Sequence, residues 1–263
     1  MSETQKTVAR IPAASERARL KDGVHIEVSP RRVRAYFDNQ LLVDSDNVLL
    51  VFETRRPPVY WFPIESVHMD LLEPKEAADS GTRRWRGKSG ARVEENLAWD
   101  YSEPAGDLAP LAGHIAFYWN AVDRWFEEDE EVFVHPRDPY TRVDTVHSSR
   151  HLRVEVDGQV VAETTRPVLL YETGLPTRYY IPKLDVRMDL LEATHTVTHC
   201  PYKGTASYWS LKVGDNAYKD FVWAYPRPIP EIPKIENLLC FYNEKVDLFV
   251  DGVKQERPVS PFS

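Results

Sequence analysis

The chain has 263 residues, of which 42% are hydrophobic, so it can form one large globular domain or two of ordinary size. Its formal net charge of -8 argues against a nucleic-acid or anionic-membrane binder, because such proteins need a basic surface to neutralise phosphate. Two cysteines make no disulfide framework and favour a reducing compartment, so we expect a cytoplasmic protein. No stretch approaches the roughly 18 apolar residues of a membrane span, and residues 1–20 lack a signal-peptide core.

One segment of the chain occurs twice. Residues 53–73 read ETRRPPVYWFPIESVHMDLLE and residues 172–192 read ETGLPTRYYIPKLDVRMDLLE, with eleven of twenty-one positions identical and no gap. A repeat at a fixed offset, here 172 − 53 = 119, predicts two homologous domains. We expect a flexible polar arm over 1–23, a degenerate first repeat over 24–140 and a site-bearing second repeat over 141–263, packed as an intrachain pseudo-dimer.

The predicted elements are almost all strands. Each repeat opens with a hairpin, which turns at Asp38 and Asn39 in the first repeat and at Asp157 and Gly158 in the second. Further strands of the second repeat are rich in β-branched and aromatic residues: 168–172, 177–181, 187–192, 205–213, 217–225 and 246–250. One short helix is expected per repeat, over 108–114 and 230–237. This order predicts an all-β protein of two compact antiparallel domains, each with two packed sheets.

The offset between the repeats drifts along the chain. Gly87 is matched with Gly204 at 117, and Trp99 with Trp223 at 124. On this alignment residues 83–87 of the first repeat replace Cys200–Gly204 of the second. We therefore expect a longer hairpin in the second repeat, turning at Gly214 and Asp215, since insertions at a hairpin tip cost little entropy.

Several motifs of the second repeat together resemble one known family, the bacterial and fungal domain-of-unknown-function family four-two-seven. They are the residues Glu172, Pro176, Tyr179, Pro182, Cys200, Pro201, Tyr202, Lys203, Gly204, Trp223, Tyr225, Pro228, Phe241, Tyr242, Val246 and Asp247. The resemblance covers essentially the whole second repeat and most of the first. It implies a compact antiparallel domain related to the β-tent folds, without their zinc-binding cysteines. It also brings a nucleotidyltransferase-like label to which no reaction is attached.

The sequence argues against nucleotidyl transfer. Common nucleotidyltransferases need a Gly-Ser pair and paired carboxylates that hold a metal ion at the phosphate. None of the 11 glycines of this chain is followed by serine. The label therefore carries no prediction of activity.

The segment Cys200–Gly204 is the sharpest local feature of the second repeat. A thiol attacks as thiolate, and Lys203 and His199 are near enough in sequence to favour that form. The alternative is a tight turn closed by proline and glycine, with Cys200 as a small buried side chain. In either case Lys203 is expected to face a pocket from the turn.

Glu172 and Arg166 form a second difference between the repeats, because the first repeat keeps the carboxylate as Glu53 but has Asn47 in place of the arginine. On one strand Glu172 and Arg166 share a face but are too far apart to touch. Glu172 is then a general base or a ligand acceptor, or it forms a buried ion pair with an arginine of another strand.

No metal or cofactor is expected. His195 and His199 lie on a predicted strand, where four residues span roughly 13 Å, so they cannot share an ion. The aromatic residues are expected either to pack in the core or to flank a planar ligand.

These observations predict a metal-independent enzyme that acts by acid–base or nucleophilic chemistry on a small polar or aromatic metabolite, as a hydrolase or a lyase. The alternative is a non-catalytic small-molecule-binding module. The catalytic candidates are Glu172, Cys200 and Lys203, and the substrate-binding candidates are Arg166, Tyr179, Tyr202, Trp223 and Tyr225.

Overall fold

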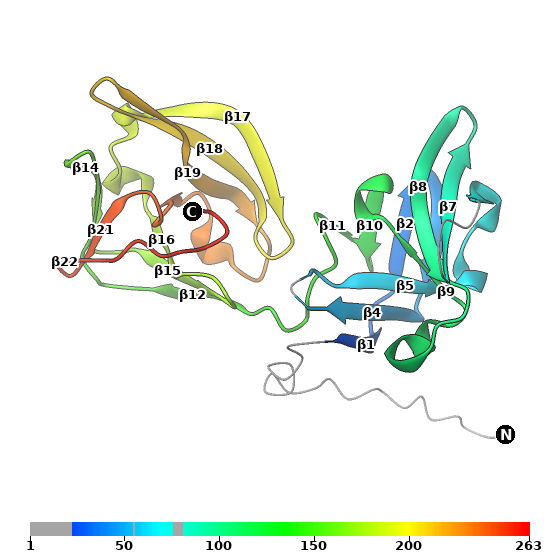
Figure 1. Cartoon of the computed structure of the whole chain (residues 1–263). Helices are drawn as coiled ribbons and strands as arrows, with labels where there is room; N and C mark the ends of the chain where they lie inside the picture. Colours follow the sequence, from blue (N-terminus) through cyan, green and yellow to red (C-terminus); the bar gives the residue numbers. More distant parts are fainter. Residues whose placement is uncertain (1–22, 55, 76–80) are drawn as a thin grey trace. The chain divides into compact units, whose positions relative to one another are not determined.

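The structure is a computed structural model and describes residues 23–54, 56–75 and 81–263. The chain divides into two compact units, Met1–Asp138 and Pro139–Ser263. Each unit contains one seven-stranded and one four-stranded antiparallel sheet (Figure 1). The predicted all-β fold with two similar halves is confirmed. The predicted arm lies, apart from Gly23, outside the described residues.

The strands of the two units follow the same order. In the first unit the seven-stranded sheet consists of β1 (Val24–Ser29), β4 (Val48–Glu53), β5 (Val59–Pro63), β9 (His114–Phe117), β8 (Arg92–Tyr101), β7 (Thr82–Ser89) and β6 (Leu72–Pro74). Its four-stranded sheet consists of β11 (Glu130–Val132), β10 (Arg124–Glu127), β2 (Val33–Phe37) and β3 (Gln40–Ser45).

The second unit repeats this arrangement strand for strand. Its seven-stranded sheet consists of β12 (Val143–His147), β15 (Val168–Glu172), β16 (Arg178–Ile181), β20 (Leu239–Phe241), β19 (Asn216–Pro228), β18 (Gly204–Val213) and β17 (Leu191–Cys200). Its four-stranded sheet consists of β22 (Val253–Lys254), β21 (Asp247–Val250), β13 (Leu152–Val156) and β14 (Gln159–Thr164).

The opening hairpins turn where the sequence predicts. Asp38 and Asn39 have φ of 50° and 61°, and Asp157 and Gly158 have φ of 51° and 75°. Positive φ at both central residues defines the turn that matches the twist of a two-residue hairpin. Asp, Asn and Gly tolerate that backbone, so the local sequence sets the register of both hairpins.

The helices are all short 3₁₀ turns among the described residues. They are η1 (Ile64–Ser66), η2 (Met69–Leu71), η3 (Gly106–Leu111), η4 (Trp119–Ala121), η5 (Lys183–Asp185), η6 (Met188–Leu190) and η7 (Pro233–Ile235). Pro110 lies inside η3, where a missing backbone donor keeps a helix short, and Pro233 begins η7. The helices predicted over 108–114 and 230–237 overlap η3 and η7, and the other 3₁₀ turns were not predicted.

The predicted strand over 187–192 is wrong for most of its length, because Met188–Leu190 forms η6 and β17 begins only at Leu191. The turn is fixed by the four-stranded sheet, since the backbone N–H of Arg187 donates to the carbonyl of Val161 at 2.9 Å. The equivalent bond in the first unit joins His68 to Leu42, also at 2.9 Å. Both repeats therefore use their shared Met-Asp-Leu-Leu sequence to turn rather than to extend.

The extra residues of the second repeat lie in the β17–β18 hairpin and not in the β18–β19 hairpin. Leu72 pairs with Gly87 and Leu191 pairs with Leu211, so 87 − 72 = 15 residues become 211 − 191 = 20. Beyond these pairs the offset is 124 as far as β9 and β20. The β7–β8 and β18–β19 hairpins therefore close at the same length. Gly87 therefore corresponds to Leu211, and its predicted match with Gly204 is wrong.

The two glycines have different physical roles. A Cβ at Gly87 would clash with the side chain of Leu97, so close packing between β7 and β8 requires a glycine there. Gly204 instead has φ of +100°, and a Cβ would lie 3.1 Å from the carbonyl of Arg227. The turn before β18 therefore depends on glycine through its backbone conformation.

The second seven-stranded sheet is buried on both faces. One face packs on the four-stranded sheet through Ile181, Leu211, Val222, Ala224, Leu239 and Phe241. The other, which we call the outer face, carries Val168, Leu170, Tyr180, Ala206, Trp223, Tyr225 and Cys240, and is partly covered by Ile232 and Ile235. In the described part of the chain, no helix is long and apolar enough to cross a membrane.

Candidate functional site

An ion pair between Glu172 and Lys203 is the centre of the candidate site. Strand alternation places Glu172 on the outer face with Val168 and Leu170. The Lys203 Nζ donates to the Glu172 carboxylate, and the two side chains are only 12% and 8% exposed. The sequence grouped these two residues correctly, but the partner of the carboxylate is a lysine from a turn rather than an arginine from a strand.

The longer β17–β18 hairpin is what brings Lys203 to this position. The turn is closed by the Lys203 backbone N–H, which donates to the Cys200 carbonyl at 3.3 Å. It is tied to the end of β19 because the N–H of Ile229 donates to the Lys203 carbonyl at 3.2 Å. The five additional residues therefore extend the sheet far enough to aim a lysine back over β15.

A second ion pair joins Arg178 of β16 to Glu244, which follows β20. Its two hydrogen bonds measure 2.7 and 2.8 Å, and the side chains are 6% and 1% exposed. Burial opposes ionisation of Glu244, but the bonds from Arg178 and Ser260 outweigh it and hold the pKa of the carboxyl below its ordinary value. The carboxylate and the guanidinium are therefore both charged at neutral pH.

Cys240 lies between the two ion pairs. Burial raises the pKa of its thiol to about 12, although the positive charges of Arg178 and Lys203 act in the opposite direction. At neutral pH this thiol is protonated and fully enclosed, so it is a packing residue rather than a nucleophile.

Tyrosines and one tryptophan fill the remainder of the outer face. The indole N–H of Trp223 donates to the Tyr180 hydroxyl at 3.3 Å, and its ring lies 4.5 Å from that of Tyr242. Burial raises the pKa of Tyr225, and the nearby Cys200, Tyr208 and Glu172 groups raise it further. Cys200 is half-buried against these rings, so the outer face brings together a carboxylate, an ammonium, a thiol and several phenols.

Among its described residues, the first repeat has neither ion pair on the same face, although it keeps Trp99, Tyr101 and Tyr118 there. Glu53 is 41% exposed and pairs with Arg56 at 2.8 Å. The registers of β5 and β9 place Val59 where the second repeat has Arg178, and Ala116 where it has Cys240. At the offset of 124, Asn120 replaces Glu244. The same strands therefore fold without either ion pair.

A family profile matches the chain twice, over residues 25–128 and 144–252, and is described as a domain of unknown function (DUF427). The chain belongs to this family. It holds one DUF427 domain in each unit, as the resemblance in its sequence predicts. No curated protein matches the chain in sequence.

Two predicted site residues of the second DUF427 repeat lie elsewhere. Tyr179 points to the opposite face from Arg178 and Tyr180, where it packs on the core between the sheets. Arg166 precedes β15 and bonds to Asp185 with two contacts of 3.0 Å. Their assignment to a common site with Glu172 is therefore wrong.

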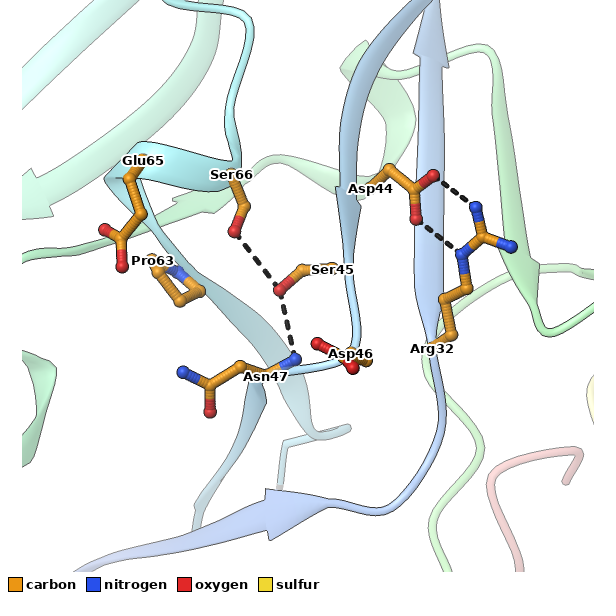
Figure 2. A pocket seen from close by; sticks show the side chains of 8 residues that line it. All are labelled: Arg32, Asp44, Ser45, Asp46, Asn47, Pro63, Glu65 and Ser66. Carbon is orange, nitrogen blue, oxygen red and sulfur yellow. Dashed lines mark hydrogen bonds and ion pairs between the residues drawn. The ribbon is translucent and has the colours of Figure 1, made fainter. Parts of the chain in front are cut away.

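The first repeat has a polar hollow of about 490 Å³, lined in part by Asn47, the residue that corresponds to Arg166 (Figure 2). There Ser66 donates to Ser45 at 3.3 Å, and the Asn47 side chain stands beside the hollow. In the second repeat the guanidinium of Arg166 bonds to the equivalent of Ser66, Asp185. Arg166 therefore stands where the first repeat has an open hollow. Its ion pair with Asp185 explains the difference between arginine and Asn47 without any ligand.

The histidines of β17 and Tyr202 complete the predicted set. His199 Nδ1 lies 2.9 Å from the Thr205 hydroxyl, and His195 is exposed. Within residues 23–54, 56–75 and 81–263, no group of three or more His, Cys, Asp or Glu side chains could hold a metal ion. Tyr202 is half-buried in the turn that carries Lys203.

Sequence reasoning missed Arg178, Glu244, Tyr208 and Tyr242. The difference between the repeats was a usable signal for the first three, because the first repeat has Val59, Asn120 and Arg84 in their places. Arg178 and Glu244 are 66 residues apart, so only the adjacency of β16 and β20 reveals that they form a pair.

Proposed function

We propose that the second DUF427 repeat binds a small polar or aromatic metabolite on its outer face and acts on it by acid–base chemistry. The Glu172–Lys203 pair carries this proposal, because it is nearly enclosed, lies against the aromatic cluster and is lacking from the otherwise equivalent first repeat. Glu172 would accept a proton from the substrate, and Lys203 would donate one to the oxygen that becomes negatively charged.

Energetics support a functional reason for the pair. Removing two charges from water costs several kcal/mol per ion, and apolar residues of similar volume are often equally stable in such places. The first repeat shows that this fold does without the pair. Titratable groups enclosed together beside aromatic side chains are typical of active sites.

The second candidate function is a non-catalytic binding module. Both enclosed carboxylates already have a cationic partner, Glu172 with Lys203 and Glu244 with Arg178. Matched charges of this kind suit the recognition of a polar ligand without proton transfer. Metal-independent catalysis and simple binding therefore differ in whether Glu172 titrates during the reaction.

The first experiment identifies the ligand. Protein purified from its own host would be examined by native mass spectrometry for a retained small molecule, which is then added back to wild type, Glu172→Gln, Lys203→Met and Glu53→Gln. We expect the first two variants to lose roughly 100-fold or more in turnover, as for removal of a general acid or base. Glu53→Gln is the matched control and should keep its activity, because its carboxylate is exposed.

Two outcomes decide between the candidates. Conversion of the ligand by wild type, with binding but no conversion by Glu172→Gln, supports the enzyme. Binding without conversion by wild type supports the module. Equal damage from Glu53→Gln in a folded protein would refute a single site in the second repeat. The Cys200→Ser variant tests for a covalent mechanism. Its turnover should fall by orders of magnitude if Cys200 is the nucleophile, and should change little if Cys200 only packs.

A further inference from the structure

The last residues of the second unit, 255–263, form a strap that continues beyond the DUF427 match, which ends at residue 252. The strap returns over the second unit after β22 (Figure 1, red). The Gln255 N–H donates to the Leu248 carbonyl at 2.8 Å, and Arg257 pairs with Asp247 at 3.0 Å. Val259 is 94% exposed, so the middle of the strap is held by few contacts.

The end of the strap contacts the outer-face site through two side chains. The Ser260 hydroxyl donates to the Glu244 carboxylate, and the Phe262 backbone N–H donates to the Ser260 oxygen at 3.1 Å. The Phe262 ring lies 5.5 Å from the Arg178 guanidinium and 6.3 Å from the Tyr242 ring. The strap thus presents one phenyl ring and one hydroxyl donor to the site.

We use the term aromatic slot for the place where the Phe262 ring lies against Arg178 and Tyr242, with Trp223 and Glu244 beside them. The Arg178 guanidinium lies 5.6 Å from the Trp223 ring and 5.5 Å from the Phe262 ring. The ring centroids of Trp223 and Tyr242 are 4.5 Å apart, so these two rings pack against each other. Phe262 remains 44% exposed, which means that its ring is seated at the edge of the slot.

We propose that the strap is an intramolecular occupant of this slot, and that an aromatic ligand carrying a hydroxyl or ammonium donor displaces it. The ring of the ligand would take the place of Phe262 over Arg178, where a planar ring is attracted to the cation. Its donor would replace the Ser260 hydroxyl at Glu244, and an anionic group is disfavoured there because Glu244 is itself a carboxylate.

Nothing in the fold requires this arrangement. The first repeat has Val59 and Asn120 at the positions of Arg178 and Glu244. It therefore has neither the guanidinium nor the carboxylate that the strap contacts in the second repeat. A segment with an exposed middle and few side-chain anchors opens easily, as ligand-gating segments must. The inference rests on the proposed function, because it assumes that the outer face binds a metabolite. It adds the chemical class of that metabolite and names a segment of the chain that competes with it.

Binding of benzyl alcohol tests the proposal, because this probe combines a phenyl ring with one hydroxyl. Its affinity would be measured by NMR titration for wild type, Phe262→Ala, Ser260→Ala and Phe249→Ala. Phe249 also lies over an arginine, Arg153 at 4.4 Å, but on β21 and outside the slot. Removing the competitor should tighten binding about fivefold in Phe262→Ala and less in Ser260→Ala, with no change in Phe249→Ala.

A fluorine label on the Phe262 ring gives a second readout in protein that keeps the strap. Benzyl alcohol and benzylamine should shift the label towards its solvent-exposed position, and benzoate should not. Weaker or unchanged probe binding by Phe262→Ala would overturn the proposal, and so would probe binding that leaves the label unmoved or a failure of every variant to bind. Displacement of the label by benzyl alcohol involves no proton transfer, so a failed acid–base mechanism would leave it intact and is distinguishable from a failed strap.

Discussion

The two DUF427 repeats have the same strands in the same order, but they enclose their charges on different faces. In the second repeat the pairs Glu172–Lys203 and Arg178–Glu244 lie on the outer face. The first repeat has an apolar outer cluster that includes Val51, Trp61 and Ala116. Strand order and register therefore do not depend on the two ion pairs of this face, which separates residues that make the fold from residues available for chemistry.

The first repeat encloses a polar group between its two sheets instead. Tyr60 donates to the Glu127 carboxylate, which also pairs with Arg31. In the second repeat Val250 replaces Glu127, because Val33 pairs with Glu127 and the equivalent Leu152 pairs with Val250. Arg150, the counterpart of Arg31, instead lies 3.5 Å from the exposed Asp251. Tyr179, the counterpart of Tyr60, is only half-buried. Each repeat thus has one face where polar groups are enclosed and one where their counterparts are apolar or exposed.

Exchanging residues between the repeats should have its largest effect at Arg178. Arg178→Val leaves Glu244 enclosed without a cation, and we expect a loss of about 3–5 kcal/mol in the free energy of unfolding. The double variant Arg178→Val/Glu244→Asn reproduces the first repeat and should recover most of that loss. Urea denaturation at neutral pH measures both.

The matched control for this exchange is Arg166→Asn, which also installs the first-repeat residue. Arg166 is 62% exposed, so losing its pair with Asp185 should change stability by less than about 1 kcal/mol. A double variant as unstable as Arg178→Val alone would show that the outer face of the second repeat depends on the pair for its packing.

A smaller effect is expected at the tyrosine position between the sheets. Tyr60→Phe removes a buried donor from the Glu127 carboxylate and should cost about 1–3 kcal/mol. Tyr179→Phe should change stability by less than about 0.5 kcal/mol, since the Tyr179 hydroxyl makes no hydrogen bond to the described residues. Equal costs in thermal or urea unfolding would contradict the assignment of the enclosed cluster to the first repeat alone.

The smallest effect concerns the dependence of stability on pH at Cys240. Its folded pKa of about 12 lies above the ordinary value of 9.0, so the unfolded chain loses this proton first as pH rises. Stability from this group is complete below about pH 9 and falls above it, by at most about 1.4 kcal/mol per pH unit. Cys240→Ala, which installs the residue of the first repeat, should show a shallower decline than wild type. If the free energy of unfolding fell equally steeply with pH in wild type and Cys240→Ala between about pH 8 and 10, the tyrosines alone would cause the decline.

Much of the fold follows from local sequence. Asp157 and Gly158 fix a hairpin by their backbone preference alone, and the repeat predicts that the two units share one fold. The predicted strand over 187–192 turns instead, because the bond that turns it comes from Val161 of the other sheet. Such bonds connect distant parts of the sequence and leave no local pattern.

The site was predictable where the repeats differ and only there. Lys203 stands in a hairpin that is five residues longer than its counterpart in the first repeat, and the sequence predicts it as a candidate together with Glu172. Arg166 was misplaced because β15 begins at Val168, so the period-two argument that linked it to Glu172 started outside the strand. Phe262 could not be found at all, since the strap has no counterpart in the matched family segment with which to compare it.

The pairing of early and late strands has a consequence for how such a chain arises. In each unit an early strand lies beside a late one, β2 beside β10 and β13 beside β21. The first strand of each unit lies at an edge of the seven-stranded sheet and the last strand at an edge of the four-stranded sheet, so copies can be joined head to tail without cutting a strand ladder. After gene duplication, one copy can keep its fold while the residues on its surface change. For the same reason, each unit is a suitable host for circular permutation through its β10–β11 or β21–β22 end.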